Sequence, residues 1–244
     1  MGLDAKLRLA RTLVIIDTHH DDIAAFVSAL FAHGADIIQV RDPGATLDAI
    51  KTVVETAQRI AMPLNKLVAV TGDIEVARRV MADVLVGGAD LDPGLAHGRL
   101  HEYALVGAPA FTADDCRHLA ASDAVEFALV GPVHLPAGSD ATAPGLDLVR
   151  VAVETMPVAD AKGTPWFAVG GITPDRLADV IAAGARRAGV VVTGEDDLLD
   201  VGRVSSALRQ AWADDPALQD FAFRALSTGS RASGFRSMSD PTPW

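Results

Sequence analysis

The stretch that decides the fold is PWFAVGGITPDRLADVIAAGARRAGVVVTG, residues 165–194. A short apolar run ends in two glycines, a stretch with helical spacing follows, and a second apolar run ends in Thr193 and Gly194. Continuous apolar runs of this length are typical of parallel strands that are buried on both faces, and a helix is the usual crossover between two such strands. The stretch therefore predicts a strand–helix–strand unit.

The same alternation extends through most of the chain. Strands are expected at residues 13–17, 37–41, 67–70, 84–87, 104–107, 127–130, 167–170 and 189–193, with helices between them at 22–32, 46–60, 74–81, 113–121, 146–155, 174–183 and 198–212. Eight strands with intervening helices close a parallel barrel, so we predict an α/β fold, a single (β/α)8 TIM barrel, over residues 1–213. A six-stranded doubly wound sheet is the competing fold, but no GxGxxG motif opens the first helix.

Two segments are expected to be irregular. The connection GADLDPGLAHGRLHE at 88–102 is rich in glycine and proline, which predicts a loop or a single turn. Residues 214–244 are expected to form a C-terminal tail, either partly disordered or a flap that brings Arg231 or Arg236 over a site.

Composition limits the classes of partner. Half of the 244 residues are hydrophobic, and 32 acidic against 21 basic residues give a formal charge of −11. This excess of negative charge disfavours nucleic acid and anionic membranes as partners. Cys116 is the only cysteine, which excludes an intramolecular disulfide and a cysteine metal site. No stretch approaches the ~20 apolar residues of a membrane span. We expect a cytoplasmic protein with a small-molecule ligand, and a homo-oligomer stays open.

Barrels of this kind build their sites at the C-terminal ends of the strands. Gly170 and Gly171 come between a strand and a helix start, and Thr193 and Gly194 follow the next strand. Glycine lets backbone N–H groups approach an anion, and a helix N-terminus adds partial positive charge. The two neighbouring turns predict a phosphate site, although glycines also serve tight turns that bind nothing.

A second candidate is IIQVRDPG, in which Gln39 and Arg41 share one face of a strand because side chains repeat every second residue. The guanidinium fork suits a pyrophosphate or a carboxylate. The alternative is an internal salt bridge of Arg41 with Asp17 or Asp73.

Several segments in order, IIQVRD, LVGP, APGLDLVR, PWFAVGGI and AGARRAGVVV, resemble the thiamine phosphate synthase/TenI superfamily, and the likeness covers about residues 13–208. The resemblance implies a reaction that joins a hydroxymethylpyrimidine diphosphate to a thiazole phosphate and releases pyrophosphate with the help of Mg²⁺. It also assigns the cradle for the thiazole phosphate and part of the pyrimidine pocket to residues that this chain retains, namely Gln39, Arg41, Asp90, Gly170, Gly171, Thr193 and Gly194.

The chain departs from the family pattern at the pyrophosphate end. Two lysines, a histidine and an Asn-Asp pair are replaced, at Pro43, Thr71, Gly72, Phe111 and Ser139. Asp73 and Asp90 remain as candidate ligands for Mg²⁺. Losing one charged donor to a transition state typically costs ~10²–10³-fold in rate.

These departures lead us to expect a diverged protein that binds a phosphorylated thiazole- or thiamine-type ligand, with ordinary synthase activity lost or altered. TenI-like proton transfer, the chemistry of a thiazole tautomerase, would need a general base, and His134 is the best-placed candidate, followed by His19 and His20. The alternatives are a genuine thiamine phosphate synthase, which is a transferase, and a non-catalytic ligand-binding or regulatory protein.

Overall fold

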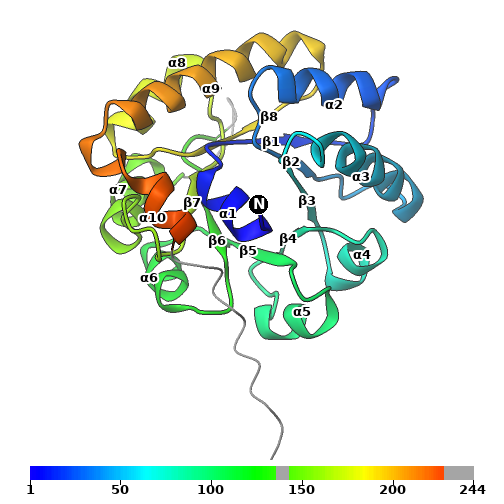
Figure 1. Ribbon diagram of the computed structural model, residues 1–244, viewed down its shortest axis with the longest axis horizontal. Helices are drawn as coiled ribbons and strands as arrows, with labels where there is room; N and C mark the ends of the chain where they lie inside the picture. Colours follow the sequence, from blue (N-terminus) through cyan, green and yellow to red (C-terminus); the bar gives the residue numbers. More distant parts are fainter. Residues whose placement is uncertain (136–142, 228–244) are drawn as a thin grey trace, which may run out of the picture.

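The strands form a closed parallel barrel, as the sequence predicts. The computed structural model describes residues 1–135 and 143–227. Each strand pairs with its neighbours in chain order, and β1 pairs with both β2 and β8, which closes the sheet (Figure 1). The strands are β1 Thr12–Ile16, β2 Ile37–Val40, β3 Leu67–Thr71, β4 Val84–Val86, β5 Leu105–Ala110, β6 Phe127–Val130, β7 Trp166–Ala168 and β8 Ala188–Val191. The fold is therefore a single (β/α)8 TIM barrel.

Helices surround the barrel and cover the outward faces of the strands (Figure 1). Those of the ring are α2 Ile23–Ala32, α3 Leu47–Ala61, α4 Ile74–Arg79, α5 Pro93–Arg99, α6 Ala113–Ala121, α7 Gly145–Thr155, α8 Pro174–Ala182 and α9 Leu198–Ala213. Several begin at a side chain that accepts a backbone N–H of the first turn, and Thr112 and Asp115 form a complete capping box at α6. Among the described residues, no helix is long and apolar enough to cross a membrane.

The expectation of a loop or single turn at 88–102 is wrong, because α5 forms there. Asp92 caps this helix by accepting hydrogen bonds from the N–H groups of Gly94 and Leu95, and Pro93 takes the first helical position. Proline is favoured at that position because its missing N–H would have no partner in the helix. Pro93 and Gly94, which suggested a loop, thus stand where a short helix starts.

Side chains from alternate strand positions fill the barrel. The rings of Phe127 and Phe167 meet edge to face with centroids 6.1 Å apart. Gly107 on β5 makes room for them, since a Cβ there would lie 2.3 Å from the ring of Phe127. Burying one such aromatic ring contributes roughly 1.5–3 kcal/mol, so this layer is a packed core.

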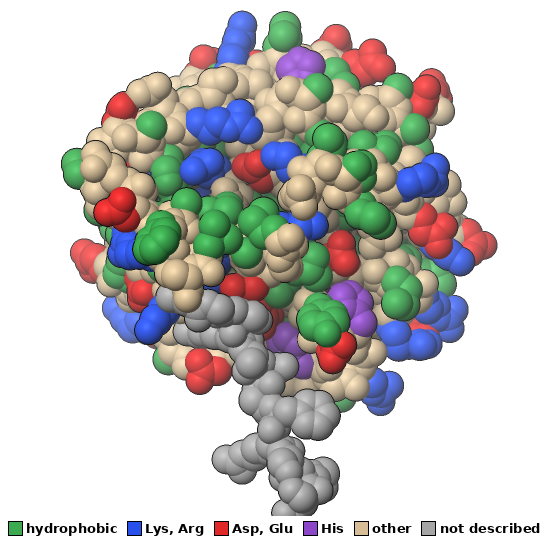
Figure 2. Space-filling model, viewed as in Figure 1, with side chains coloured by type: hydrophobic (Ala, Val, Ile, Leu, Met, Phe, Trp, Pro, Cys, Tyr) green, Lys and Arg blue, Asp and Glu red, His purple; other side chains and the backbone are tan. Residues whose placement is uncertain are grey.

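The N-terminal end of the barrel is closed by segments outside the ring. Helix α1 (Leu3–Leu9) lies across the near end of the barrel in Figure 1, and α10 (Phe221–Ser227) lies beside it. Figure 2 shows hydrophobic side chains gathered near the centre of this face, with acidic and basic side chains around them. Part of the segment expected to be a tail is thus a helix, which ends at Ser227. Arg231 and Arg236 lie outside the described residues.

Candidate functional site

The mouth of the barrel is the opening at the C-terminal ends of its strands. The strand positions whose side chains point into the barrel identify the residues that line this mouth. Counting two residues at a time from the inward-facing core positions leads to the last inward positions of four strands, namely Ile15, Gln39, Thr71 and Val191. Val191 is 60% exposed although it follows this inward register. The barrel is therefore open to solvent at its C-terminal end, where the sites of this fold lie.

Gln39 lies in the floor of this mouth and is 2% exposed. Its Nε2 donates to Thr71 Oγ1 at 2.6 Å, and its Oε1 is buried without a hydrogen-bond partner in the described part of the chain. A buried acceptor without a partner is costly, and it is usually explained by a water or a ligand that supplies a donor. Thr71 is one of the departures from the family pattern, and it holds the Nε2 of the Gln39 amide. The Oε1 of Gln39 is left to accept a hydrogen bond from a ligand.

Arg41 follows the end of β2 and is exposed. The alternative expectation was an internal salt bridge with Asp17 or Asp73, but within residues 1–135 and 143–227 neither carboxylate pairs with Arg41. Asp17 lies beside His19 and His20, and Asp73 Oδ1 accepts the Val76 N–H at the start of α4. The guanidinium is therefore available to an anionic ligand.

The turn after β7 is shaped by close packing. Gly170 and Gly171 have φ values of +91° and +60°, and a Cβ on Gly170 would lie 2.6 Å from the Cβ of Pro132. The loop after β6 is tied to this turn, because His134 N donates to Gly170 O at 3.0 Å. The glycines are needed for this approach whether or not an anion binds, so their role in phosphate binding stays a prediction.

His134 lies against the same turn. A Cβ on Gly171 would be 2.7 Å from the Cβ of His134, and His134 Nε2 is buried with no hydrogen-bond partner in the residues described. Its catalytic role stays a prediction. The adjoining positions 136–139, including Ser139, lie outside the described residues.

The end of β8 holds a contact that the sequence interpretation missed. Thr193 donates from its backbone N and from Oγ1 to Asp197 Oδ2, at 2.8 and 3.2 Å. These are the donors expected to bind a phosphate, and a carboxylate of the chain itself holds both. The available signal was the run Glu195–Asp197, three consecutive acidic residues that form a 3-10 turn directly after Gly194.

Asp73 and Asp90 stand after β3 and β4, which are neighbours in the barrel. The part of the chain that the structure describes contains no group of three or more His, Cys, Asp or Glu side chains suited to a metal ion. Mg²⁺ typically uses one or two protein carboxylates and fills its other positions with water and substrate phosphates. The two carboxylates stand on neighbouring strand ends, and their role as magnesium ligands stays a prediction.

A second group of polar side chains joins the loops after β1 and β2. Thr18 donates from Oγ1 and from its backbone N to Asp42 Oδ2, at 2.6 and 3.3 Å, and Gly44 N donates to Asp42 Oδ1. The hydrogen bond from Thr18 is the main cause that lowers the pKa of Asp42, so this group is a carboxylate at neutral pH. His19 Nδ1 lies 3.2 Å from Asp42 Oδ2, which brings a histidine of one loop onto the carboxylate of the next.

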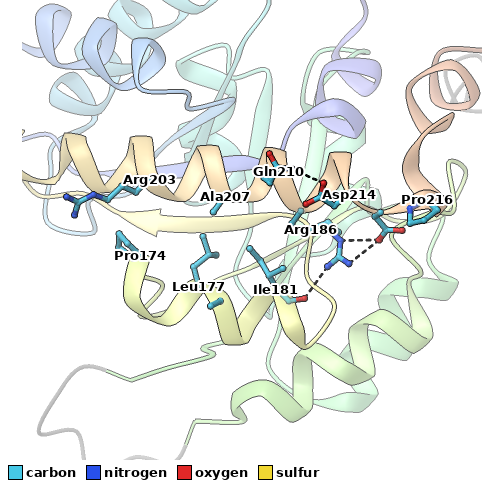
Figure 3. A pocket seen from close by; sticks show the side chains of 12 residues that line it. Pro174, Leu177, Ile181, Arg186, Arg203, Ala207, Gln210, Asp214 and Pro216 are labelled. Atoms are coloured by element: carbon cyan, nitrogen blue, oxygen red, sulfur yellow. Dashed lines mark hydrogen bonds and ion pairs between the residues drawn. The ribbon is translucent and has the colours of Figure 1, made fainter.

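A groove of about 750 Å³ lies away from the mouth, between α8 and α9. Figure 3 shows Leu177 and Ile181 facing it from α8, and Arg186 bonded to Ile181 O and Asp215. Arg186 is thus already paired, and the apolar lining comes from helices on the outside of the barrel. The groove therefore lies on the outer helices and is separate from the strand ends, where the sites of this fold are built.

Comparison with known proteins identifies one family. The family model described as thiamine monophosphate synthase matches residues 12–193. The thiamine-phosphate synthase of Mycobacterium marinum is 37% identical over 214 residues, covering 80% of this chain and 93% of that protein. The thiamine-phosphate synthase of Mycobacterium tuberculosis is 37% identical over 213 residues, covering 80% of this chain and 92% of that protein.

Solved structures support the fold. Thiamine phosphate pyrophosphorylase from Pyrococcus furiosus aligns with a TM-score of 0.71 over 86% of this chain and 99% of that chain, at 21% identity. A 3-hexulose-6-phosphate synthase aligns with a TM-score of 0.54 at 19% identity.

The expectation that ordinary synthase activity is lost or altered is contradicted by the relatives named thiamine-phosphate synthase, which favour a genuine synthase. That expectation counted lost charges position by position along the sequence. It did not include the contacts of Asp42 with Thr18 and His19, which only the fold brings together. The match of the family model and the identity to these relatives show that the chain belongs to the thiamine phosphate synthase/TenI superfamily.

Proposed function

We propose that this protein is a thiamine phosphate synthase, which joins a hydroxymethylpyrimidine diphosphate to a thiazole phosphate and releases pyrophosphate. The observation that carries the proposal is the 37% identity over 93% of the Mycobacterium marinum thiamine-phosphate synthase. Identity at this level over nearly the whole relative covers the barrel together with its strand-end loops.

The mouth supports a division of the site between the two substrates. Gln39 offers a buried amide oxygen that suits a donor on the pyrimidine, and Arg41 offers a free guanidinium beside it for the diphosphate. The turns at Gly170–Gly171 and Thr193–Gly194 would hold the thiazole phosphate through backbone N–H groups. Binding there requires that the phosphate displace Asp197 from Thr193.

Asp73 and Asp90 would hold a magnesium ion together with the diphosphate, and the bound ion would supply positive charge against the departing pyrophosphate. Asp73 has one oxygen committed to the cap of α4, so its Oδ2 is the atom that remains for the ion.

The proposal includes a cytoplasmic location. Both substrates are phosphorylated, and a multiply charged phosphate cannot cross an apolar bilayer at a useful rate without a carrier. Phosphorylated small molecules are thus the partners we propose.

The direct test is turnover by the purified protein with both substrates and Mg²⁺. We expect thiamine phosphate and pyrophosphate in equal amounts, and restored growth when the gene is expressed in cells that lack their own thiamine phosphate synthase. A folded protein that yields neither product, and that leaves such cells dependent on added thiamine, would refute the proposal.

A further inference from the structure

Two neighbouring histidines lie in the loop after β1, at the mouth of the barrel. Asp17 follows the inward register of Ile15, and its Oδ1 accepts the backbone N–H of His19 at 2.9 Å. The Nε2 of His20 lies 3.4 Å from the same oxygen. The carboxylate is thus held by the backbone on one side and faces an imidazole on the other.

The ring of His20 is fixed by packing. It stacks on Phe26 of α2 with centroids 4.0 Å apart and an interplanar angle of 22°, and its side chain is 8% exposed. His20 Nε2 is buried and makes no hydrogen bond of good geometry within the described ranges. Asp17 Oδ1 lies within ion-pair distance of it at 3.4 Å, so Nε2 is the ring nitrogen that the carboxylate orients.

His19 differs from His20 in its exposure. Its side chain is 78% exposed and lies 3.2 Å from Asp42, so solvent surrounds it. Within the described residues, Asp17 is the carboxylate beside His20, and Asp42 lies against His19. Asp21 and Asp22 follow His20 directly in the chain. Helix α2, which packs against His20 through Phe26, carries no charged residue between Ile23 and Ala32.

Among the described residues, His134 also has a buried Nε2 without a hydrogen bond. It lies against the turn after β7, where the thiazole phosphate is expected, and no carboxylate of the described residues lies within ion-pair distance of it. The Nε2 of His20 differs in facing a carboxylate oxygen, Asp17 Oδ1, at 3.4 Å, and this pairing of an imidazole with an orienting acid is typical of sites where the other ring nitrogen exchanges the proton.

We propose that His20 is the general acid of the synthase reaction and that Asp17 positions its ring; this inference rests on the proposed function. When the bond between the pyrimidine methylene carbon and the bridging oxygen breaks, the electron pair goes to that oxygen. The imidazolium donates the proton of its Nδ1 there, because Nε2 faces Asp17, and His20 becomes neutral. The thiazole nitrogen then attacks the pyrimidine cation, and His20 regains a proton from solvent after pyrophosphate leaves.

The reason for a proton donor is the charge of the leaving group. The family lysine after Arg41 is Pro43 here, so one cation that would neutralise the diphosphate is missing. Protonation of the leaving oxygen lowers the negative charge of the pyrophosphate, which the missing lysine would otherwise neutralise. Histidine suits this task because imidazole ordinarily exchanges its proton near neutral pH.

The test compares His20→Asn with the wild type, and His118→Asn on the outer helix α6 is the matched control. We expect His20→Asn to lower kcat by ~10²-fold or more, the usual contribution of a general acid, while KM for both substrates changes little. The fall in kcat of the wild type at alkaline pH should disappear in this variant. His118→Asn should keep the kcat and the pH profile of the wild type.

Two further measurements separate chemistry from folding. His20→Ala should recover part of its activity when imidazole is added, which a misfolded protein cannot do, and Asp17→Asn should lower kcat by less than His20→Asn. An active wild type whose His20→Asn variant keeps both kcat and the alkaline fall overturns the inference alone. A wild type that makes no thiamine phosphate overturns the proposed function, and the inference falls with it.

Discussion

At the end of β8, Asp197 occupies the two donors of Thr193 that a phosphate would need. A carboxylate has two oxygens and a negative charge, so it can take the place of part of a phosphate at backbone N–H groups. Ligand binding must therefore break two hydrogen bonds, one from Thr193 N at 2.8 Å and one from its Oγ1 at 3.2 Å. The affinity of the site depends on this competition.

Asp197→Ala tests the competition. Removing the carboxylate frees both donors and removes a like charge, so we expect the dissociation constant for thiazole phosphate to fall by about tenfold, which corresponds to about 1.4 kcal/mol. Isothermal titration calorimetry measures the change. Asp196→Ala is the control, because it removes the same charge from an exposed neighbour. Weaker binding by Asp197→Ala would mean that the contact builds the site.

The pair of His97 and Glu126 makes stability depend on pH. His97 Nε2 lies 3.4 Å from Glu126 Oε2 and 3.1 Å from Ala124 O, and the interaction with Glu126 is the main cause that raises the pKa of His97. A raised pKa in the folded state means that the protonated form is stabilised by folding. This contribution is complete below the unfolded value of about 6.5 and is lost as the pH rises through the higher folded value.

His97→Gln tests this linkage. We expect its deficit in the free energy of unfolding, relative to the wild type, to be larger at pH 5.5 than at pH 8.5, by less than about 1 kcal/mol because the pair is partly exposed. Urea unfolding at several pH values measures it, and exposed His118→Gln serves as the control. A deficit that does not change with pH would show that only packing is lost.

At the scale of elements, the sequence predicted all eight strands because buried parallel strands are largely apolar runs, such as VLV at β4 and FALV at β6. It did not predict α5, since Gly94 and Gly98 lower helix propensity and only the cap on Asp92 and the packing of Ala96 outweigh this.

Asp92→Ala measures what this cap contributes. The side chain accepts from two N–H groups of the first turn, and losing such a cap costs about 1 kcal/mol. Chemical unfolding should show this loss. Asp92→Asn should keep most of the stability, because asparagine caps nearly as well. Equal stability of all three proteins would mean that α5 is held by its tertiary contacts.

The candidate site was predictable only as far as strand ends could be located. Gln39 and Arg41 follow from the alternation of β2, which the sequence contains. The contacts of Asp197 with Thr193 and of Asp17 with His20 depend on the path of each loop. A sequence pattern does not carry that path, so both contacts were missed.

At the scale of the whole molecule, the barrel is completed by a segment assigned from the sequence to the tail. Leu218 and Phe221 pack with Trp212 in a separate apolar cluster at the N-terminal end. The guanidinium of Arg187 lies 4.9 Å from the ring of Trp212 and donates to Ala10 O and Arg8 O. Arg187 is 1% exposed, and burial lowers its pKa, so the charge depends on these carbonyls and rings.

Phe221→Ala tests whether this segment is part of the domain. The ring is 1% exposed and meets Trp212 edge to face at 5.1 Å, and it also lies 5.6 Å from the guanidinium of Arg187. Its removal leaves a cavity and takes one aromatic face from a buried cation. We expect a loss of about 3–5 kcal/mol in the free energy of unfolding, the usual cost of a buried phenylalanine.

Phe223→Ala is the matched control, because this phenylalanine stands two residues further along α10 and is 76% exposed. Its substitution should change stability by no more than about 0.5 kcal/mol. Urea unfolding followed by tryptophan fluorescence measures both variants, since Trp212 lies in the cluster itself. If Phe221→Ala were as stable as Phe223→Ala, the cluster would contribute nothing to the folded barrel. The large difference that we expect would mean that the folding unit extends through α10, because the same helix then carries one phenylalanine on which the barrel depends and one on which it does not.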